Sequence, residues 1–556
     1  MKPVATKRLL WNAPAAVAFA AIALAISLAI LLFQFRLRMG QYDPEAVPVF
    51  YRLFLFEDYP AAFLFMAAVA LAAVPGYQQA AAGLARIIGN HPLAVSLIAT
   101  VALAAGSWWI YYAHPLSPDE AAPYMQSKAL AHGALLGQYP PPLLDWLVPR
   151  SMQNGFIAVS HATGQTASAQ WPGFALLLTP FMAAGVPWLC NPVLGGASVW
   201  VIHQLTLRLT SSLEAAGAAV LFTLGSAAFV INSISFYSMT AHLLCNALFA
   251  LLLLSRTPRG AFLAGLTGGL AVTLDNFVPH SLFAIPWLLW LLTQRNRWSL
   301  ILSVSVGYLP WIAFVGFGWS HVLHGLASSP VSTQAAFHLP GAQIFRDRTI
   351  AVAKMWLWAA PLVVLLAGVG FWRHRENTFF RLLLISTALT LLGCLFMPLD
   401  QGHGWGFRYF HSVWFVVPLF AAAALAPASE TTGALASSSL GFARWAQAGA
   451  IGGLLIVTPY FAWQVHTFIG KQLARVPTTK VGTAKVIFIN PTLGYYAEDL
   501  IQNDPLLREA PIRMLTHGRK QDAEVMARYF PSLMLLAQDY RGSVWGTRLT
   551  APATPP

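Results

Sequence analysis

The sequence predicts an all-α polytopic membrane bundle with about thirteen transmembrane helices, followed by a small C-terminal α/β soluble domain. Of the 556 residues, 57% are hydrophobic and only 10% are charged, whereas soluble domains carry about 25% charged residues. Apolar segments of a length that crosses a bilayer recur along most of the chain. Because a bilayer offers the backbone no hydrogen-bonding partners, these segments must be helices.

The first span is predicted at the N-terminus, where Lys2, Lys7 and Arg8 precede an apolar run from Trp11 to Phe33. This run is longer than the apolar core of a signal peptide, so it is predicted to be retained. The stretch 173–188 is apolar but short and bounded by prolines, which favours a re-entrant or interfacial helix. The predicted spans are 13–33, 60–76, 92–112, 192–208, 215–232, 238–255, 260–277, 279–293, 299–318, 351–371, 379–396, 412–427 and 446–467.

Arginines between the spans predict which loops face the cytoplasm. If the N-terminus lies in the cytoplasm, each predicted inside loop contains at least one arginine. These arginines are Arg86, Arg208, Arg256, Arg259, Arg295, Arg297, Arg373, Arg375 and Arg444. Two long loops, 113–170 and 320–350, and the tail from about residue 468 are then predicted to lie outside, where long translocated segments are largely exempt from the rule.

Three regions follow from this pattern: a two-span extension over 1–91, a transmembrane core over 92–467, and a small outside domain over 468–556. In the last region, 485–490 and 512–515 are predicted as strands, and 498–501 and 521–529 as helices. The first long outside loop is predicted to contain interfacial helices.

The net charge of +13 does not indicate a nucleic-acid-binding protein. Such a protein gathers its basic residues on one soluble face, whereas here they lie in short clusters between spans, which is typical of topology signals. Cys190, Cys245 and Cys394 are scattered in or beside apolar segments, so no disulfide framework and no zinc-binding spacing is predicted. The composition therefore implies that the lipid bilayer is one partner of the protein.

An acidic pair, Asp119-Glu120, opens an amphipathic stretch in the first long outside loop. Tyr124 and Lys128 follow at helical spacing on one face, and we regard both as candidate substrate-binding residues. Two carboxylates at the bilayer edge are suited to acid–base chemistry: one takes a proton from an acceptor while the other holds a sugar or a metal ion. The alternative is a capped interfacial helix, in which the acids only favour the N-terminal end of the dipole.

Cationic candidates lie in the other outside loops. Arg346 lies in the second long loop and Lys354 follows at the head of the next span, while His403 and Arg408 lie in a Gly- and aromatic-rich loop before the twelfth span. Arginine and lysine are natural ligands for a phosphate or pyrophosphate. The alternative is that these residues are solvated charges that contact lipid headgroups.

Asp275 is the clearest acid within a predicted span, which makes it a candidate substrate-binding residue; it could equally lie at the outer end of that span, beside Asn276.

The chain resembles the glycosyltransferase C superfamily, in particular bacterial members related to protein O-mannosyltransferases and aminoarabinose transferases. The resemblance covers roughly 92–467. It is carried by the order and spacing of four features: Asp119-Glu120 with Tyr124 and the helix ending Ala131-His132-Gly133; Gln170-Trp171-Pro172-Gly173-Phe174 followed by Asn191-Pro192; Arg208 at the end of a span; and Gly404-Trp405-Gly406-Phe407-Arg408-Tyr409 before a late span.

The resemblance implies a polyprenyl-phosphate sugar donor, an inverting transfer on the outer face, and a glycan, lipid or protein acceptor. It implies that Asp119 is the catalytic base, that Glu120 assists, and that Arg408, with Arg346, Lys354 or His403, holds the lipid phosphate. Gln170 and Trp171 would contact substrate. It also favours a bacterial inner membrane with a periplasmic C-terminal domain. Where the family has a basic residue near the seventh span, this chain has Thr273-Leu274-Asp275-Asn276, so the donor contacts differ there.

Two other functions stay open at this point. A lipid-linked glycan flippase or polymerase would line a path through the bundle with charged residues, and few are found. A non-catalytic membrane subunit would use its tail domain to recruit a partner, and Asp119 and Glu120 would then be dispensable for activity. A divalent cation also stays open as a cofactor, since an acidic pair can bind one through oxygen, and no metal ligands are assigned.

Overall fold

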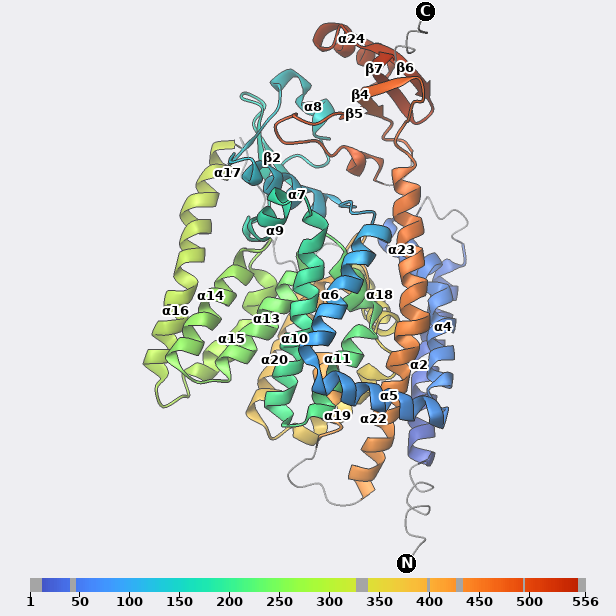
Figure 1. Ribbon diagram of the computed structural model, residues 1–556, viewed down its shortest axis with the longest axis vertical. Helices are drawn as coiled ribbons and strands as arrows, with labels where there is room; N and C mark the ends of the chain where they lie inside the picture. The colour runs from blue at the N-terminus through green and yellow to red at the C-terminus, as the bar shows by residue number, and fades with distance from the viewer. Residues whose placement is uncertain are drawn as a thin grey trace, which may run out of the picture.

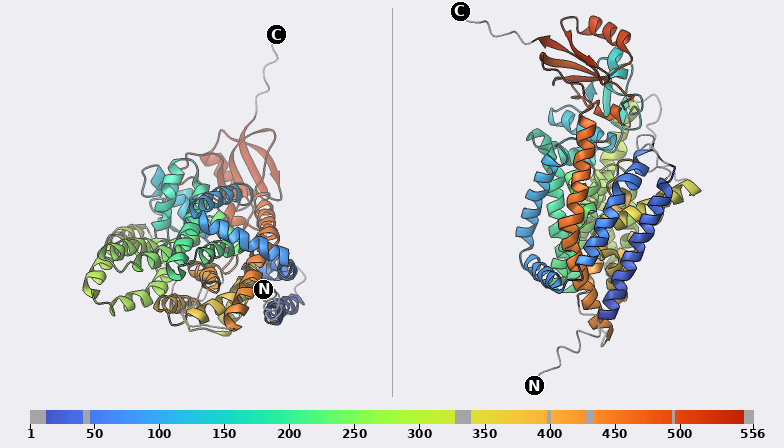
Figure 2. Two further views of the ribbon diagram at one scale, coloured as in Figure 1. Left: turned by 60° about the horizontal axis from the view of Figure 1, so that its bottom comes forward. Right: turned by 90° about the vertical axis from the view of Figure 1, so that its right-hand side faces the viewer.

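The computed structural model describes residues 13–40, 47–326, 339–397, 401–426, 434–493 and 496–548. A tall helical bundle fills one end and the middle of the molecule, and a C-terminal sheet lies at the other end (Figure 1). The first helix begins at the end of the bundle farthest from this sheet, and the long helix α23 leads up to it (Figures 1 and 2). The predicted fold class, a helical membrane bundle with a small C-terminal α/β region, is confirmed.

The bundle contains long apolar helices and several shorter helical segments. Up to the first long loop they are α2 (Ala13–Arg38), α3 (Val49–Arg52), a π-helical turn η2 (Leu53–Glu57), α4 (Asp58–Leu71), α5 (Pro75–Asn90) and α6 (Pro92–Trp109). That loop contains α7 (Pro118–Ala131), η3 (Pro141–Leu143), α8 (Leu144–Leu147) and three short strands. The middle of the bundle contains α9 (Gly173–Ala183), η4 (Pro187–Leu189), α10 (Cys190–Thr210), α11 (Leu213–Leu224), α12 (Ala227–Ile234), α13 (Met239–Leu253), α14 (Pro258–Thr273), α15 (Val278–Leu291), α16 (Arg297–Ala313), η5 (Phe314–Trp319) and α17 (Ser320–Leu326).

The last part of the bundle continues to the C-terminal region. It contains α18 (Ala342–Trp358), α19 (Val363–His374), α20 (Thr378–Gly393), η6 (Cys394–Phe396), η7 (Arg408–Val413), α21 (Val416–Ala423), α22 (Ala434–Gly452), η8 (Gly453–Val457) and α23 (Thr458–Leu473). The C-terminal region contains β4 (Gly482–Ile489), η9 (Ala497–Leu500), β5 (Ile512–Leu515), α24 (Arg519–Tyr529), β6 (Met534–Asp539) and β7 (Gly542–Arg548).

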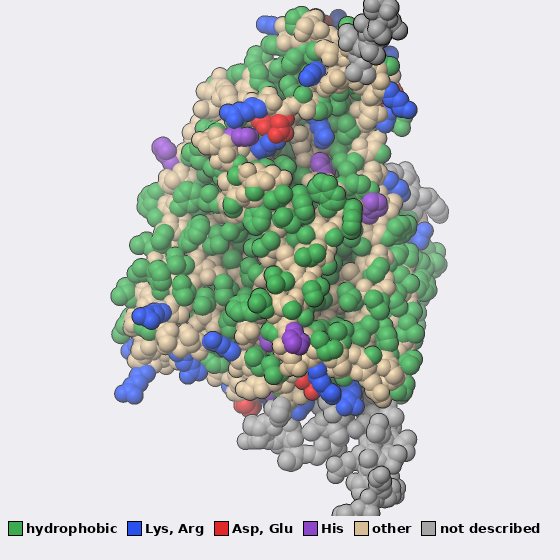
Figure 3. Space-filling view, viewed as in Figure 1, with side chains coloured by type: hydrophobic (Ala, Val, Ile, Leu, Met, Phe, Trp, Pro, Cys, Tyr) green, Lys and Arg blue, Asp and Glu red, His purple; other side chains and the backbone are tan. Residues whose placement is uncertain are grey.

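Side chains on the outside of the bundle show that this is a membrane protein. Six helices in the described residues are long and apolar enough to cross a bilayer, or eight if each of two bent pairs counts as one span. Large apolar side chains such as Ile98, Val101 and Phe317 are exposed on them. In the view of Figure 3 hydrophobic side chains cover the middle of the molecule, while charged side chains gather towards its two ends.

The predicted number of about thirteen spans is not confirmed, because several predicted spans are short or bent. The stretch predicted over 215–232 is bent by 65° between α11 and α12, and the stretch around 351–371 is bent by 93° between α18 and α19. At the second bend Pro361 ends the helical pattern and Leu362 adopts a left-handed conformation with φ of 72°. The segment 173–188, predicted not to cross the membrane, contains the 11-residue helix α9.

Two small sheets lie at the end of the molecule where the outside loops are predicted. In the first long loop, β1 (Gly137–Gln138), β2 (Ile157–Val159) and β3 (Gln165–Ser168) form an antiparallel sheet of order β1-β3-β2, which the sequence analysis did not anticipate. The C-terminal sheet has the order β5-β4-β7-β6, with β4 and β5 parallel and the other pairs antiparallel. The predicted strands and helices over 485–529 are all present, whereas the β6–β7 hairpin was not predicted.

Candidate active site

The helix α7 begins at a proline with a capping sequence before it. Ser117 is the N-cap residue, Pro118 occupies the first turn, and Glu120 returns to accept a hydrogen bond from the Ser117 N–H at 3.1 Å. This is the carboxylate half of a capping box, and proline is well tolerated in the first turn of a helix. A helix is therefore present where one was predicted, and its start is fixed by local chemistry.

Glu120 is completely buried and is held from four directions. Besides the Ser117 N–H, it accepts hydrogen bonds from the Leu116 N–H at 2.7 Å, the Phe236 N–H at 2.8 Å and the Tyr111 hydroxyl at 2.8 Å. Burial raises the pKa of Glu120 to about 7, although the four donors favour its carboxylate form. Glu120 thereby fastens α7 to the end of α6 and to the segment between α12 and α13.

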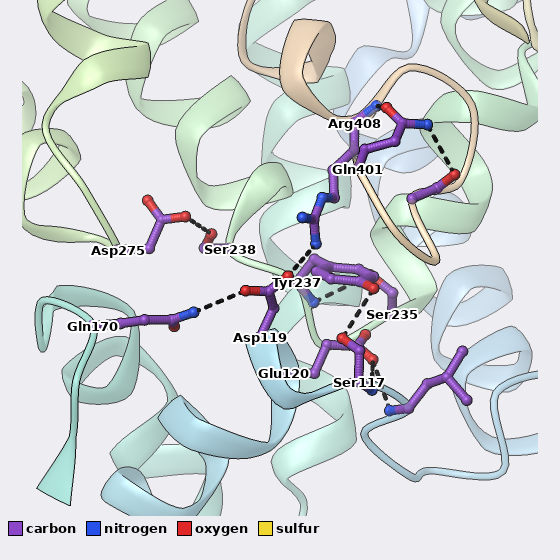
Figure 4. Close-up of polar contacts among 12 residues, drawn as sticks. Ser117, Asp119, Glu120, Gln170, Ser235, Tyr237, Ser238, Asp275, Gln401 and Arg408 are labelled. Atoms are coloured by element: carbon purple, nitrogen blue, oxygen red, sulfur yellow. Dashed lines mark hydrogen bonds and ion pairs between the residues drawn. The ribbon is translucent and has the colours of Figure 1, made fainter. Parts of the chain in front are cut away.

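Asp119 has a different environment from its neighbour. Its Oδ2 accepts a hydrogen bond from Arg408 Nη1 at 2.6 Å, and its Oδ1 accepts one from Gln170 Nε2 at 3.2 Å (Figure 4). The side chain is still 32% exposed. A carboxylate offers more acceptor positions than these two donors fill, so Asp119 is fixed in orientation and keeps room for a further hydrogen bond.

Arg408 is positioned by its own loop and by two tyrosine rings. Gln401 accepts a hydrogen bond from the Arg408 N–H at 2.9 Å and donates to the carbonyls of Gly404 and Gly406. The guanidinium carbon lies 4.8 Å from the ring centre of Tyr237 and 5.4 Å from that of Tyr409, which is cation–π geometry. Among the residues that the structure describes, Arg408 Nε is buried without a hydrogen-bond partner.

Gly406 lies in a tight turn of the loop before Arg408. Its φ is +67°, in the left-handed region, and a Cβ there would also lie 3.3 Å from the Ala228 side chain. A residue with a side chain would be strained at this position. The tight turn allows Gln401 to reach the backbone on both sides of it, and so places Arg408 beside Asp119.

The Gln170-Trp171 segment approaches the same place from another part of the chain. The Trp171 N–H donates to the Asp275 carbonyl at 3.1 Å, and the Trp171 ring packs on Phe277 with centroids 5.8 Å apart. A Cβ on Gly173 would lie 2.5 Å from the Thr273 carbonyl oxygen, so only glycine allows the two segments to come this close. This packing directs Gln170 towards Asp119 (Figure 4).

Asp275 lies in the loop between α14 and α15, at the outer end of its predicted span. Its carboxylate accepts from the Ser238 hydroxyl at 3.0 Å and from the Asn276 N–H at 2.6 Å, and it pairs with His242 Nε2 at 2.6 Å. Burial acts to raise its pKa, but the His242 imidazole and the two hydrogen-bond donors outweigh burial and hold the pKa below its usual value. Ser238 adjoins Tyr237, whose ring lies beside the Arg408 guanidinium, so Asp275 lies near Arg408 (Figure 4).

Tyr124 and Lys128 face away from Asp119. A step of five residues from Asp119 to Tyr124, or of nine to Lys128, leads to the opposite side of an α-helix. Lys128 instead pairs with Glu509 and lies 3.5 Å from Asp504, both in the C-terminal region. With Tyr124, it lines a cavity of about 230 Å³ between α7 and that region.

The predicted cations other than Arg408 do not contact Asp119 in the described parts of the chain. Lys354 Nζ donates to Asp58 at 2.7 Å, and both side chains are fully buried. Arg346 donates to the Tyr51 hydroxyl at 3.1 Å and to Gln343.

His403 is buried against the rings of Tyr496 and Phe468, and burial lowers its pKa to about 3, so it is neutral at physiological pH.

Several polar side chains of this site were not predicted. Tyr111, Tyr237, His242 and Gln401 each contact a predicted residue or support one. Arg348, two residues after Arg346, lies over the Tyr409 ring at 5.3 Å and donates to the carbonyls of Cys394 and Met397. The sequence signal that could have identified these residues is a polar side chain near the start of an apolar helix, as at Tyr237-Ser238 and His242.

The described residues contain no group of three or more His, Cys, Asp and Glu side chains arranged to hold a metal ion. The polar constellation around Asp119 consists of carboxylates paired with an arginine, an amide, hydroxyls and one imidazole. Its chemistry is therefore suited to holding an anion and to accepting a proton at a fixed oxygen.

Comparison with known proteins gives matches of structure only. No model of a protein family matches the chain, and no curated protein matches its sequence. The solved structures that are similar to it include two of ArnT from Cupriavidus metallidurans. The structure of ArnT bound to undecaprenyl phosphate is 12% identical, with 81% of this chain and 97% of that chain covered and a TM-score of 0.49. The structure in the apo state is 11% identical over the same shares, with a TM-score of 0.47.

Proposed function

We propose that this protein is a membrane glycosyltransferase that moves a sugar from a polyprenyl-phosphate donor to a periplasmic or lipid-linked acceptor, with inversion at the anomeric carbon. The observation that carries the proposal is the geometry of Asp119, a partly exposed carboxylate held between Arg408 and Gln170 at the outer edge of a membrane bundle. The four sequence features shared with the glycosyltransferase C superfamily support the same assignment.

In this proposal Asp119 is the general base. The acceptor hydroxyl or amine forms a bond to the anomeric carbon while the bond from that carbon to the phosphate oxygen breaks. The acceptor proton passes to the Asp119 carboxylate, and polyprenyl phosphate leaves with the bonding electron pair. Because Asp119 is fixed by two donors, it needs little rearrangement to receive the proton, which is the geometric requirement for a general base.

Arg408 is assigned to the donor phosphate. Its Nη1 is used by Asp119, while Nε lacks a partner among the described residues and remains for a phosphate oxygen. A positive charge at the leaving oxygen stabilises the charge that develops as the bond breaks. One guanidinium then joins the two halves of the reaction, since it orients the base and holds the leaving group.

The remaining predicted residues receive revised roles. Glu120 is a structural anchor, Lys354 belongs to a buried ion pair with Asp58, and Lys128 joins α7 to the C-terminal region. Gln170 positions Asp119, with Trp171 packed behind it.

Asp275, which pairs with His242 beside Ser238, is proposed to contact the donor sugar, where family members have a basic residue.

The proposed setting is a bacterial inner membrane, with the N-terminus in the cytoplasm and the C-terminal domain in the periplasm. Arginines in each predicted inside loop support this orientation. The regions 1–91, 92–467 and 468–556 are proposed as an N-terminal extension, the catalytic transmembrane core and a periplasmic α/β domain.

The experiment is a transfer assay on purified protein with a panel of radiolabelled polyprenyl-phosphate sugars and membrane extract as acceptor. Asp119→Asn keeps the size of the side chain but removes the basic oxygen, so transfer is expected to fall by at least a hundredfold, the scale of general-base catalysis. Asp539→Asn, which alters an exposed ion pair in the C-terminal region, is the matched control and is expected to retain activity.

A result in which folded wild-type protein transfers no sugar from any donor would overturn the proposal and favour a lipid-linked glycan flippase or a recruiting subunit. Equal transfer by wild type and Asp119→Asn would reject Asp119 as the base while leaving the enzyme class in place.

A further inference from the structure

A second cationic cavity lies at the outer ends of α3 and α23, outside the Asp119 site. It has a volume of about 110 Å³. Arg52 lines it from α3, and Lys471 and Arg475 line it from α23 and the turn that follows. Glu57 is the carboxylate in the lining, so three cations face one anion and the cavity favours a negatively charged occupant.

One buried side chain in this cavity lacks the partners that it needs. Gln464 lines the cavity and is only 2% exposed, yet neither its Nε2 nor its Oε1 has a hydrogen-bond partner within the described ranges. A buried amide without partners costs free energy, and such groups are rare in folded proteins unless a ligand or water completes them. Gln464 is therefore a second sign, independent of charge, that a polar group occupies the cavity.

The position of the cavity indicates that the occupant comes from the membrane. Trp463, beside Gln464 and also in the lining, is 61% exposed on the outer surface of α23. Tryptophans of this kind are enriched where lipid tails meet headgroups. Lys471 lies eight residues further along the helix, or about 12 Å at the rise of an α-helix, so the basic residues stand on the headgroup side of this tryptophan.

The walls of the cavity are held in place by contacts between distant segments. The Tyr460 hydroxyl donates to the Glu57 carbonyl at 2.8 Å, and the Arg52 guanidinium lies over the Phe468 ring at 5.7 Å. Gln472 accepts from Arg475 Nη1 at 2.7 Å and donates to the Tyr496 carbonyl. The cavity is therefore a formed feature that joins the N-terminal extension to α23.

We propose that this cavity binds the phosphate group of an anionic membrane lipid, with Arg52, Lys471 and Arg475 around the phosphate and Gln464 hydrogen-bonded to the headgroup. Basic pockets between transmembrane helices bind lipid headgroups in this way, and arginine suits a phosphate because its fork matches two oxygens. The lipid would fasten the extension of residues 1–91 to the catalytic core. The proposal goes beyond the transfer reaction, and only its polyprenyl-phosphate control rests on the proposed function.

The test measures lipid retained by purified full-length protein, with native mass spectrometry after exchange into detergent micelles that contain phosphatidylcholine and phosphatidylglycerol. Arg52→Gln with Lys471→Gln is expected to weaken phosphatidylglycerol binding at least tenfold. Arg519→Gln with Lys520→Gln removes the same charge from the exposed surface of α24 and is expected to leave binding unchanged. Equal binding by the two double variants would overturn the proposal.

The Gln464→Leu variant tests whether the Gln464 amide binds a ligand or is merely poorly packed. This variant relieves the unpartnered amide, so the lipid-free protein is expected to melt at the same temperature as wild type or higher. Its stabilisation by added phosphatidylglycerol is expected to be smaller than that of wild type. A stabilisation as large as that of wild type would contradict the assigned role of Gln464.

Two further probes identify the source of the phosphate. Inorganic phosphate alone is expected not to compete with phosphatidylglycerol, because the acyl chains contribute to binding. Polyprenyl phosphate is expected to leave phosphatidylglycerol bound, because the donor has its own site at Arg408. Displacement by either one would overturn the assignment to a resident membrane lipid.

Discussion

At the scale of single residues, the adjacent carboxylates of α7 have different surroundings and different roles. Successive residues of an α-helix point about 100° apart. This places Glu120 among buried donors of the segments after α6 and after α12, and it leaves Asp119 partly exposed beside Arg408. The sequence indicates that the pair is special, but only the positions of Tyr111 and Phe236 decide which acid is structural.

Glu120→Gln and Asp119→Asn should therefore have opposite effects on stability and activity. The glutamine amide would place N–H groups against the N–H donors that Glu120 now accepts from, so we expect a loss of about 1–3 kcal/mol of stability. Asp119→Asn should melt close to wild type while losing transfer. Thermal melting in detergent by intrinsic fluorescence measures both, and an equal loss of stability for the two variants would contradict this division.

At the scale of elements, the second span shows where a hydropathy pattern fails. The sequence predicts a span over 60–76, which begins after the acidic pair Glu57-Asp58. In the structure the apolar helical segment is continuous over Val49–Leu71, and α5 is a separate helix. Asp58 is tolerated inside it because Lys354 of α18 and the Trp358 indole both bind its carboxylate. Because Lys354 lies almost 300 residues away in the sequence, the local hydropathy pattern cannot indicate that it pairs with Asp58.

Breaking this buried pair should destabilise the junction of α4 with α18. Asp58→Ala leaves the Lys354 ammonium buried and unpaired, which is expected to cost about 3–5 kcal/mol. The double variant Asp58→Leu with Lys354→Leu removes both charges and is expected to recover most of that loss. Melting temperatures of the single and double variants provide the measurement, and a double variant no more stable than the single one would show that the pair does not act as a unit.

The elements that could be predicted are those with strong local signals. The capped start of α7 and the first strand and helix of the C-terminal region follow from proline, capping residues and apolar runs. The bent helices, the three-stranded sheet of the first long loop and the β6–β7 hairpin depend on tertiary contacts. Of the candidate site residues, Asp119 contacts Gln170 and Arg408, and the Asp275 backbone contacts Trp171, whereas Lys354 is satisfied by an acid of the N-terminal extension.

At the scale of the whole molecule, the proposed site joins segments that are far apart in the chain. The Asp119–Arg408 contact spans 289 residues and connects the first long loop to the loop before α21. The other face of α7 is bound to the C-terminal region, where Lys128 pairs with Glu509 and the Gln502 amide donates to the Pro115 carbonyl at 2.8 Å. The helix that carries the proposed base is thus held between the bundle and the C-terminal domain.

The Asp119–Arg408 ion pair is proposed to combine acceptor activation with donor binding, and steady-state transfer kinetics of Arg408→Ala test this proposal. Donor and acceptor concentrations are varied separately in the purified protein. Loss of the phosphate ligand is expected to raise KM for the polyprenyl-phosphate donor at least tenfold, since a charge-assisted hydrogen bond is worth about 1.5–3 kcal/mol, while KM for the acceptor changes less than about twofold. Equal increases for both substrates, or no change in either, would contradict the assignment of Arg408 to the donor phosphate.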